Sequence, residues 1–127
     1  MAGAERPRYF AGKLLTAEDF ELEQEYHIER RRLLNRMLHG AGVVSGLKVG
    51  EESAGTVTVE PGFALDPRGR EILVCEPHEL TIPESDEPVS ICVLYRERET
   101  DRGTICETYE VVATAAVPED AVVLAVI

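Results

Sequence analysis

The sequence has 127 residues, with 24 acidic against 13 basic side chains and a formal net charge of −11. This length predicts one domain, and the negative charge disfavours broad contact with nucleic acid or anionic membranes. No stretch is apolar over the roughly 18 residues that a membrane-spanning helix needs. The N-terminus lacks the apolar core of a secretory signal, so we expect synthesis in the cytoplasm without membrane insertion.

The first thirteen residues are predicted to form an extended arm that carries aromatic side chains. Pro7 disfavours the helical conformation at Arg6, which precedes it. Tyr9 and Phe10 lie in this arm, although the whole chain has only four Tyr and three Phe. Aromatic side chains at a terminus need a surface to cover them, so we expect the arm to pack on its own domain or on a neighbour.

A long helix is predicted from Ala17 to about His39. Thr16 can cap its N-terminus, because Asp19 at the third helical position completes a capping box. Gly40 or Gly42 offers a C-terminal stop. Acidic residues crowd the first half and basic residues the second half, an order that complements the helix dipole.

This helix is predicted to be amphipathic and longer than its own domain can cover. At about 1.5 Å per residue, a helix of this length spans roughly 35 Å. We therefore expect it to overhang and to use its apolar stripe as an interface. The stripe at helical spacing consists of Leu22, Tyr26, Leu33 and Met37, widened by Phe20, Leu34 and Leu38.

The remainder of the chain predicts short β-strands without helices between them. Asp66-Pro67-Arg68-Gly69 has the residue order of a type I turn, and residues 100–103 are predicted as the turn of a long hairpin. We expect an α+β fold, in which one long N-terminal amphipathic helix precedes a small antiparallel β-sandwich or barrel. The predicted parts are residues 1–42 for arm and helix and 43–127 for the β-domain. The predicted strands are Val43–Val49, Thr56–Glu60, Phe63–Leu65, Glu71–Cys75, Glu79–Ile82, Val89–Glu99, Thr104–Thr114 and Ala121–Ile127.

Cysteine and histidine provide one candidate chemistry, a metal- or ligand-binding β-domain. Cys75 and His78 have a plausible two-residue gap, with Cys92 as a further donor, but no second close pair accompanies them. In the predicted hairpin Ile91, Val93, Tyr95, Ile105, Tyr109 and Val111 face the core. Cys92 and Cys106 then share the other face, and Cys92 lies opposite Glu110 or Val112, too far from Cys106 for a disulfide. Reduced structural thiols are the favoured interpretation, with no metal and no cofactor.

Paired carboxylates provide a second alternative, because Asp66 and Glu71 can act as acid and base beside an arginine. Asp66 already serves the turn, and the sequence has no nucleophile elbow, phosphate loop, dinucleotide fingerprint or HExxH motif. The sequence therefore gives no positive reason to expect an enzyme.

The opening of the chain resembles a recurring segment of phage-tail and contractile-injection-system proteins. In that family an aromatic–x–Gly–x–x–Leu–Thr–x–x–Asp–Phe arm precedes a helix with Gln-x-Tyr. Residues 8–20 and 23–26 carry this pattern. Weaker similarity continues at Asn35, Leu38, His39, Gly40, Gly42, Val43, Val44, Gly46, Leu47, Val59–Asp66, Gly69–Ile72 and Pro118–Ala125.

The resemblance implies a non-catalytic structural component near a baseplate, spike or tail fibre, part of an assembled particle and often a homo-oligomer, with a trimer among the arrangements. Many relatives continue past this point into fibre or receptor-binding regions, and the present sequence does not. We therefore expect attachment or assembly rather than receptor binding as its role. The predicted interface residues are Tyr9, Phe10, Leu14, Phe20, Leu22, Tyr26, Leu33 and Met37.

Overall fold

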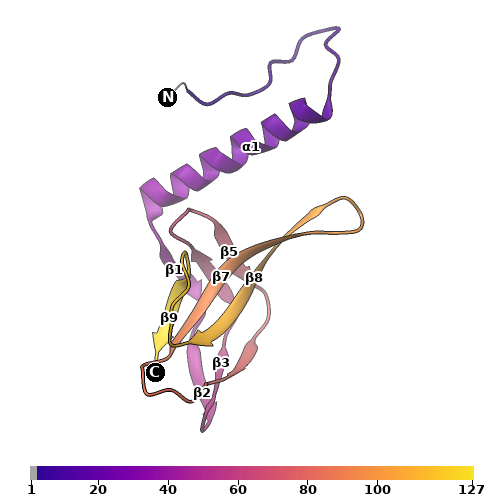
Figure 1. Cartoon of the computed structure of the whole chain (residues 1–127). Coiled ribbons are helices and arrows are strands. Elements are labelled where there is room, and N and C mark those ends of the chain that lie inside the picture. The colour runs from indigo at the N-terminus through magenta and orange to yellow at the C-terminus, as the bar shows by residue number, and fades with distance from the viewer. Residues whose placement is uncertain (1–2) are drawn as a thin grey trace.

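The computed structural model describes residues 3–127, and it has the expected α+β composition (Figure 1). An extended arm leads into α1 (Ala17–Leu34), which continues as the π-helix η1 (Asn35–His39). Met1 and Ala2 of the predicted arm lie outside the described residues. The strands are β1 (Gly42–Gly46), β2 (Val49–Ser53), β3 (Thr56–Val59), β4 (Gly62–Leu65), β5 (Glu71–Val74), β6 (His78–Thr81), β7 (Ser90–Glu99), β8 (Ile105–Thr114) and β9 (Val122–Val126).

The ends of the helical segment follow from its capping residues. The Asp19 amide donates a 3.3 Å hydrogen bond to the Thr16 hydroxyl, and the Thr16 amide donates a 3.1 Å bond to the Asp19 carboxylate, which completes the predicted capping box. At the other end Gly40 has a positive φ of 74°, and its amide donates to the carbonyl of Asn35. The five π-helical residues were not expected, since α-helical periodicity carries no signal for them.

Three antiparallel sheets of three strands each share one hydrophobic core. Their strand orders are β1-β4-β5, β2-β3-β6 and β8-β7-β9. The predicted antiparallel pairing is confirmed, and each sheet contributes side chains to the same cluster. Its buried members are Leu47, Val57, Val59, Ala64, Ile72, Val74, Ile91, Val93, Tyr95 and Val122.

The prediction of a single strand over Val43–Val49 is wrong. Gly46 and Leu47 have φ angles of 65° and 57°, which end β1 and turn the Leu47 side chain into the core. A Cβ atom at Gly46 would lie 2.3 Å from the carbonyl oxygen of Pro61, so only glycine fits there. Consequently β1 pairs with β4, whereas the next segment pairs with β3 in a different sheet.

The long hairpin is confirmed, and half of it leaves the body of the domain. Cys92 pairs with Val112, as one of the two predicted registers requires. Residues 90–95 are buried, but residues 96–99 of β7 and the start of β8 are exposed (Figure 1). Ile105, expected in the core, is 63% exposed because it lies on this projection. Within residues 3–127, no helix is long and apolar enough to cross a membrane.

Candidate interaction surface

The helical segment is attached to the β-domain near its C-terminal end. The Asn35 side-chain amide donates a 2.9 Å hydrogen bond to the carbonyl of Gly69, and Arg36 donates a 3.3 Å bond to the carbonyl of Arg68. Arg31 forms an ion pair with Glu71 on β5. These contacts fasten the helix to the turn between β4 and β5 through polar groups.

That turn is organised by Asp66, whose side chain is fully buried. One carboxylate oxygen accepts hydrogen bonds of 2.9 Å from the amides of Arg68 and Arg70, and the other accepts a 2.7 Å bond from the Arg70 guanidinium. The Arg70 guanidinium carbon lies 4.9 Å from the ring centre of Tyr95, and Arg68 pairs with Asp120 at 2.8 Å. The predicted turn is confirmed, and its aspartate is engaged in holding it.

The carboxylates of the enzyme alternative do not converge on one pocket. A cleft of about 420 Å³ lies between the helix and the β-domain, and Glu71 lines it whereas Asp66 does not. Glu71 is also paired with Arg31, so neither carboxylate is placed as an unengaged acid or base. The geometry therefore offers this alternative no observation in its favour.

The N-terminal half of the helix lies away from the β-domain. None of the eighteen residues of α1, all of which the structure describes, is buried. The arm runs back along one face of the helix instead, as Figure 1 shows. The Arg6 guanidinium carbon lies 5.9 Å from the ring centre of Tyr26, and Lys13 pairs with Asp19 at 3.5 Å.

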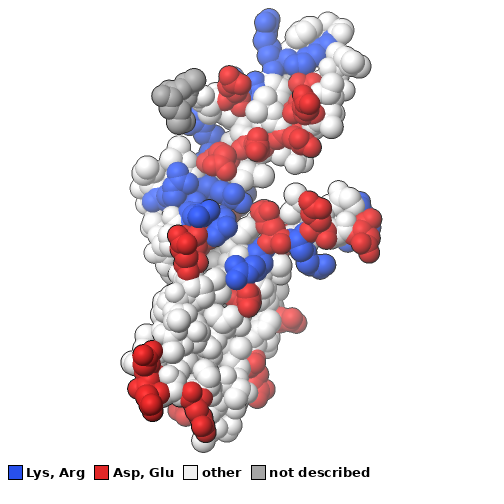
Figure 2. Space-filling view, in the orientation of Figure 1, with Lys and Arg blue, Asp and Glu red and all other residues white. Residues whose placement is uncertain are grey.

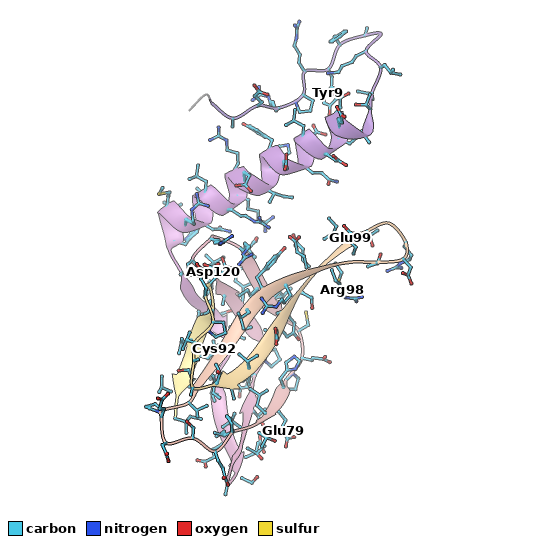
Figure 3. The ribbon with its side chains drawn as sticks, viewed as in Figure 1. Tyr9, Glu79, Cys92, Arg98, Glu99 and Asp120 are labelled. Atoms are coloured by element: carbon cyan, nitrogen blue, oxygen red, sulfur yellow. The ribbon has the colours of Figure 1, made fainter. Side chains whose placement is uncertain are left out.

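The contact between arm and helix shifts the pKa values of two tyrosines in opposite directions. Partial desolvation and the neighbouring Glu23 carboxylate raise the pKa of Tyr9, an arm residue that lies beside α1 (Figure 3). The guanidinium groups of Arg6 and Arg30 lower the pKa of Tyr26, since they favour its phenolate. The arm is therefore held to the helix mainly by cationic and aromatic groups.

The predicted interface residues divide into exposed and half-buried groups. Leu14 is 83% exposed and Met37 is 77% exposed, and Tyr9, Phe10 and Phe20 are also exposed. Leu22, Tyr26 and Leu33 are half-buried on the face that the arm follows. Further exposed apolar side chains extend this surface, and of these the predicted interface set omitted Leu15, Leu34, Leu38, Val43 and Val44.

The exposed apolar residues that the predicted interface lacked differ in whether the sequence indicated their exposure. Leu34 and Leu38 belong to the widened stripe, so helical periodicity already indicated them. Val43 and Val44 were expected within a core strand, and the break at Gly46 is what leaves them exposed. Exposed apolar side chains therefore occur on the arm, on the helical segment and on β1.

The cysteine and histidine donors do not form a cluster. Cys75 is exposed after β5, whereas Cys92 is buried in β7 (Figure 3), where burial raises the pKa of its thiol. His78 Nε2 lies 2.6 Å from the Tyr109 hydroxyl and is engaged in that hydrogen bond. In the part of the chain that the structure describes, no three His, Cys, Asp or Glu side chains are arranged to hold a metal ion.

No model of a known protein family matches the chain, and no curated protein matches it. The exposed apolar side chains and the resemblance of the opening segment are therefore the observations that bear on function.

Proposed function

We propose that this chain is a non-catalytic structural component of a phage-tail-like contractile injection particle. It attaches to other subunits, and to copies of itself, through its N-terminal arm and helical segment. The observation that carries the proposal is an apolar surface on elements that add nothing to the core of their own domain. Its exposed members on the arm and helix are Tyr9, Phe10, Leu14, Leu15, Phe20, Ile28, Leu34, Met37 and Leu38.

Such a surface on a small soluble domain is typical of a protein–protein interface. Covering a large aliphatic or aromatic side chain stabilises a complex by about 1.5–3 kcal/mol when the side chain becomes fully buried. Several such side chains are exposed on the arm and helical segment, so a partner subunit that covers them gains apolar contacts. The acidic β-domain exposes eight large apolar groups over residues 43–127, against nine over residues 3–42, and serves as the body that carries the helix.

The form of the helix supports attachment by this segment. In proteins most helical stability comes from tertiary packing of an apolar face rather than from helix propensity. Here a capping box, the backfolded arm and the polar junction around Gly69 hold α1 in place without burying any of its side chains. We infer that the helix is maintained for what it presents to a partner, since it contributes little to its own fold.

The choice of particle rests on the resemblance of residues 8–26 to phage-tail and injection-system proteins. These residues form the second part of the arm and the first ten residues of α1, so the pattern overlaps the exposed residues Tyr9 to Phe20. A baseplate, spike or fibre subunit is the partner class that the resemblance indicates. We further propose that the three sheets act together as one sandwich- or barrel-like body, and their shared core supports this view.

The proposal is tested by particle incorporation. We expect Phe10→Glu and Met37→Glu each to leave the chain folded but to prevent its co-purification with assembled particles. Val126→Glu is the matched control, because Val126 is an exposed apolar residue on β9, outside the surface. Normal incorporation of both glutamate variants at the arm and helix would overturn the proposal.

A further inference from the structure

A second feature of the molecule is a groove between α1 and the projecting end of the β7–β8 hairpin. Its volume is about 890 Å³. In Figure 1 the helix and the hairpin diverge from the junction, and the hairpin tip and the N-terminal end of α1 lie on the same side of the molecule. The groove is therefore open at the end where the arm turns into the helix.

The groove has acidic walls and two apolar side chains. Glutamates come from the helix at positions 21, 25 and 29 and from the hairpin at positions 97 and 107. Figure 2 shows acidic side chains gathered along the helix and along the hairpin. Ile28 and Ile105 supply the apolar contacts, and both are exposed.

The cation inside the groove is already engaged. Arg32 lies 3.5 Å from Glu97 and 3.9 Å from Glu29, and its guanidinium carbon is 5.7 Å from the ring centre of Tyr95. Glu21 and Glu25, in contrast, form no ion pair with any residue in the range 3–127. Two neighbouring carboxylates on one helical turn are thus available to a cationic partner.

The chain's own arm does not fill this groove. Arg6 lies against Tyr26, and Tyr9 lies near Glu23. At about 100° per residue, positions 23 and 26 point away from the face that carries Glu21, Glu25 and Ile28. The described part of the arm therefore occupies the opposite face of α1 and leaves the groove unfilled.

We propose that the groove binds the tip of the N-terminal arm of a second copy of this chain. The tip is residues 8–15, and it combines the cation Arg8 with exposed apolar side chains, whereas Lys13 is engaged with Asp19 of its own chain. A turn at Ala11–Gly12, closed by a 3.2 Å hydrogen bond from the Lys13 amide to the Phe10 carbonyl, makes it a protruding loop.

Charge and apolarity match between tip and groove. In the proposed contact, Arg8 of the second copy faces the unpaired carboxylates of Glu21 and Glu25. Phe10 and Leu14 of that copy supply apolar area for Ile28 and Ile105 of the groove. Complementary charges of this kind set the register and partner choice of an interface. The inference rests on the proposed function, because it identifies the copy-to-copy contact and leaves the apolar face around Met37 for other subunits.

Charge reversal in the full chain tests this contact. In sedimentation experiments at low ionic strength, Arg8→Glu and Glu25→Arg should each weaken self-association at least about tenfold, since each places like charges together. The double variant should restore the wild-type value within about threefold, because it recreates an opposite-charge pair. Glu79→Arg on β6 (Figure 3) makes the same charge change outside the groove and should have no effect.

A labelled peptide of residues 3–16 provides an independent measurement. It should bind the wild-type chain and fail to bind the Glu25→Arg variant, with circular dichroism showing that the variant is folded. Unchanged self-association in both single variants, or no restoration in the double variant, overturns the groove contact. If wild-type chains stay monomeric at high micromolar concentration yet enter particles, the groove contact fails and the proposed function survives. If, in addition, particle incorporation does not depend on Phe10 and Met37, the groove contact and the proposed function are both wrong.

Discussion

A Cβ atom at Gly69 would lie 2.1 Å from the backbone oxygen of Arg32. Gly69 also has a φ of 81°, and its carbonyl accepts the hydrogen bond from Asn35. The turn between β4 and β5 thus touches the helix backbone directly. This close approach, together with the hydrogen bonds of Asn35 and Arg36 to the same turn, positions α1 on the β-domain.

Gly69→Ala is expected to displace the helix. A positive φ alone costs a non-glycine residue about 1–2 kcal/mol, and the clash with Arg32 adds to this. We expect a loss of at least about 1 kcal/mol beyond that of Gly55→Ala in urea unfolding. Gly55 is the matched control, because its φ is 80° but a Cβ there would meet nothing within 4 Å. Equal losses in the two variants would show that the close approach has no energetic role.

The buried carboxylate of Asp66 provides a prediction about the same turn. Asp66→Ala removes three hydrogen bonds and leaves Arg70 with only its 3.9 Å contact to the Asp120 carboxylate. Breaking a buried ion pair costs about 3–5 kcal/mol, and the partial exposure of Arg70 places the expected loss near about 3 kcal/mol. Asp86→Ala, in the exposed loop before β7, should change the free energy of unfolding by less than about 0.5 kcal/mol. A loss below about 1 kcal/mol for Asp66→Ala would contradict this account of the turn.

Stability at high pH should depend on Tyr95. Burial, followed by the nearby Glu97 and Glu107 carboxylates, raises the pKa of its hydroxyl well above the ordinary 10.0. Because the pKa of the Tyr95 hydroxyl is higher in the folded than in the unfolded chain, it contributes its full stability below the unfolded pKa of about 10. This contribution is lost as the pH rises from there toward the folded pKa. The free energy of unfolding should therefore fall above pH 10 by up to about 1.4 kcal/mol per unit for this group.

Tyr95→Phe should reduce that alkaline slope, as measured by urea unfolding between pH 9 and 11. Part of the alkaline slope should remain in this variant, because burial raises the pKa of Tyr109 as well. Tyr26→Phe is the contrasting variant: the pKa of Tyr26 is lowered, so removing its hydroxyl should not reduce the slope. An unchanged slope in Tyr95→Phe would refute the assignment.

Metal content separates the proposed function from its β-domain alternative. Because His78 is bonded to Tyr109 and Cys92 is buried in the core, we expect chelator treatment to leave the melting temperature unchanged. Elemental analysis should find zinc well below one atom per chain. Stoichiometric zinc that is lost in a Cys75→Ser variant would instead favour the metal-binding alternative.

Local residue chemistry is what made parts of this structure predictable. Thr16 and Gly40 marked the helical segment, and Asp66-Pro67 marked a turn, because caps and turns depend on the residues themselves. The hairpin followed from alternation and from the turn at residues 100–103. Five of the eight predicted interface side chains are exposed, whereas Leu22, Tyr26 and Leu33 are half-buried.

Tertiary contacts decided the remainder. The break at Gly46 and Leu47 depends on the carbonyl of Pro61, which is distant in the chain until β1 and β4 pair. Ile105 had the alternation of a core residue, but the hairpin extends past the sheet and leaves it exposed. The groove was unpredictable for the same reason, because it exists only through the angle between α1 and that hairpin.

Hydrogen exchange in free and particle-bound chains tests the central claim most directly. The account predicts that amides in the arm and helical segment, residues 3–39, exchange slowly in the particle and much faster in the free chain. Amides of the β2-β3-β6 sheet serve as the internal reference and should exchange equally in both states. If the arm and helix exchange at the same rate free and assembled, no partner covers their apolar surface, and the attachment proposal is wrong.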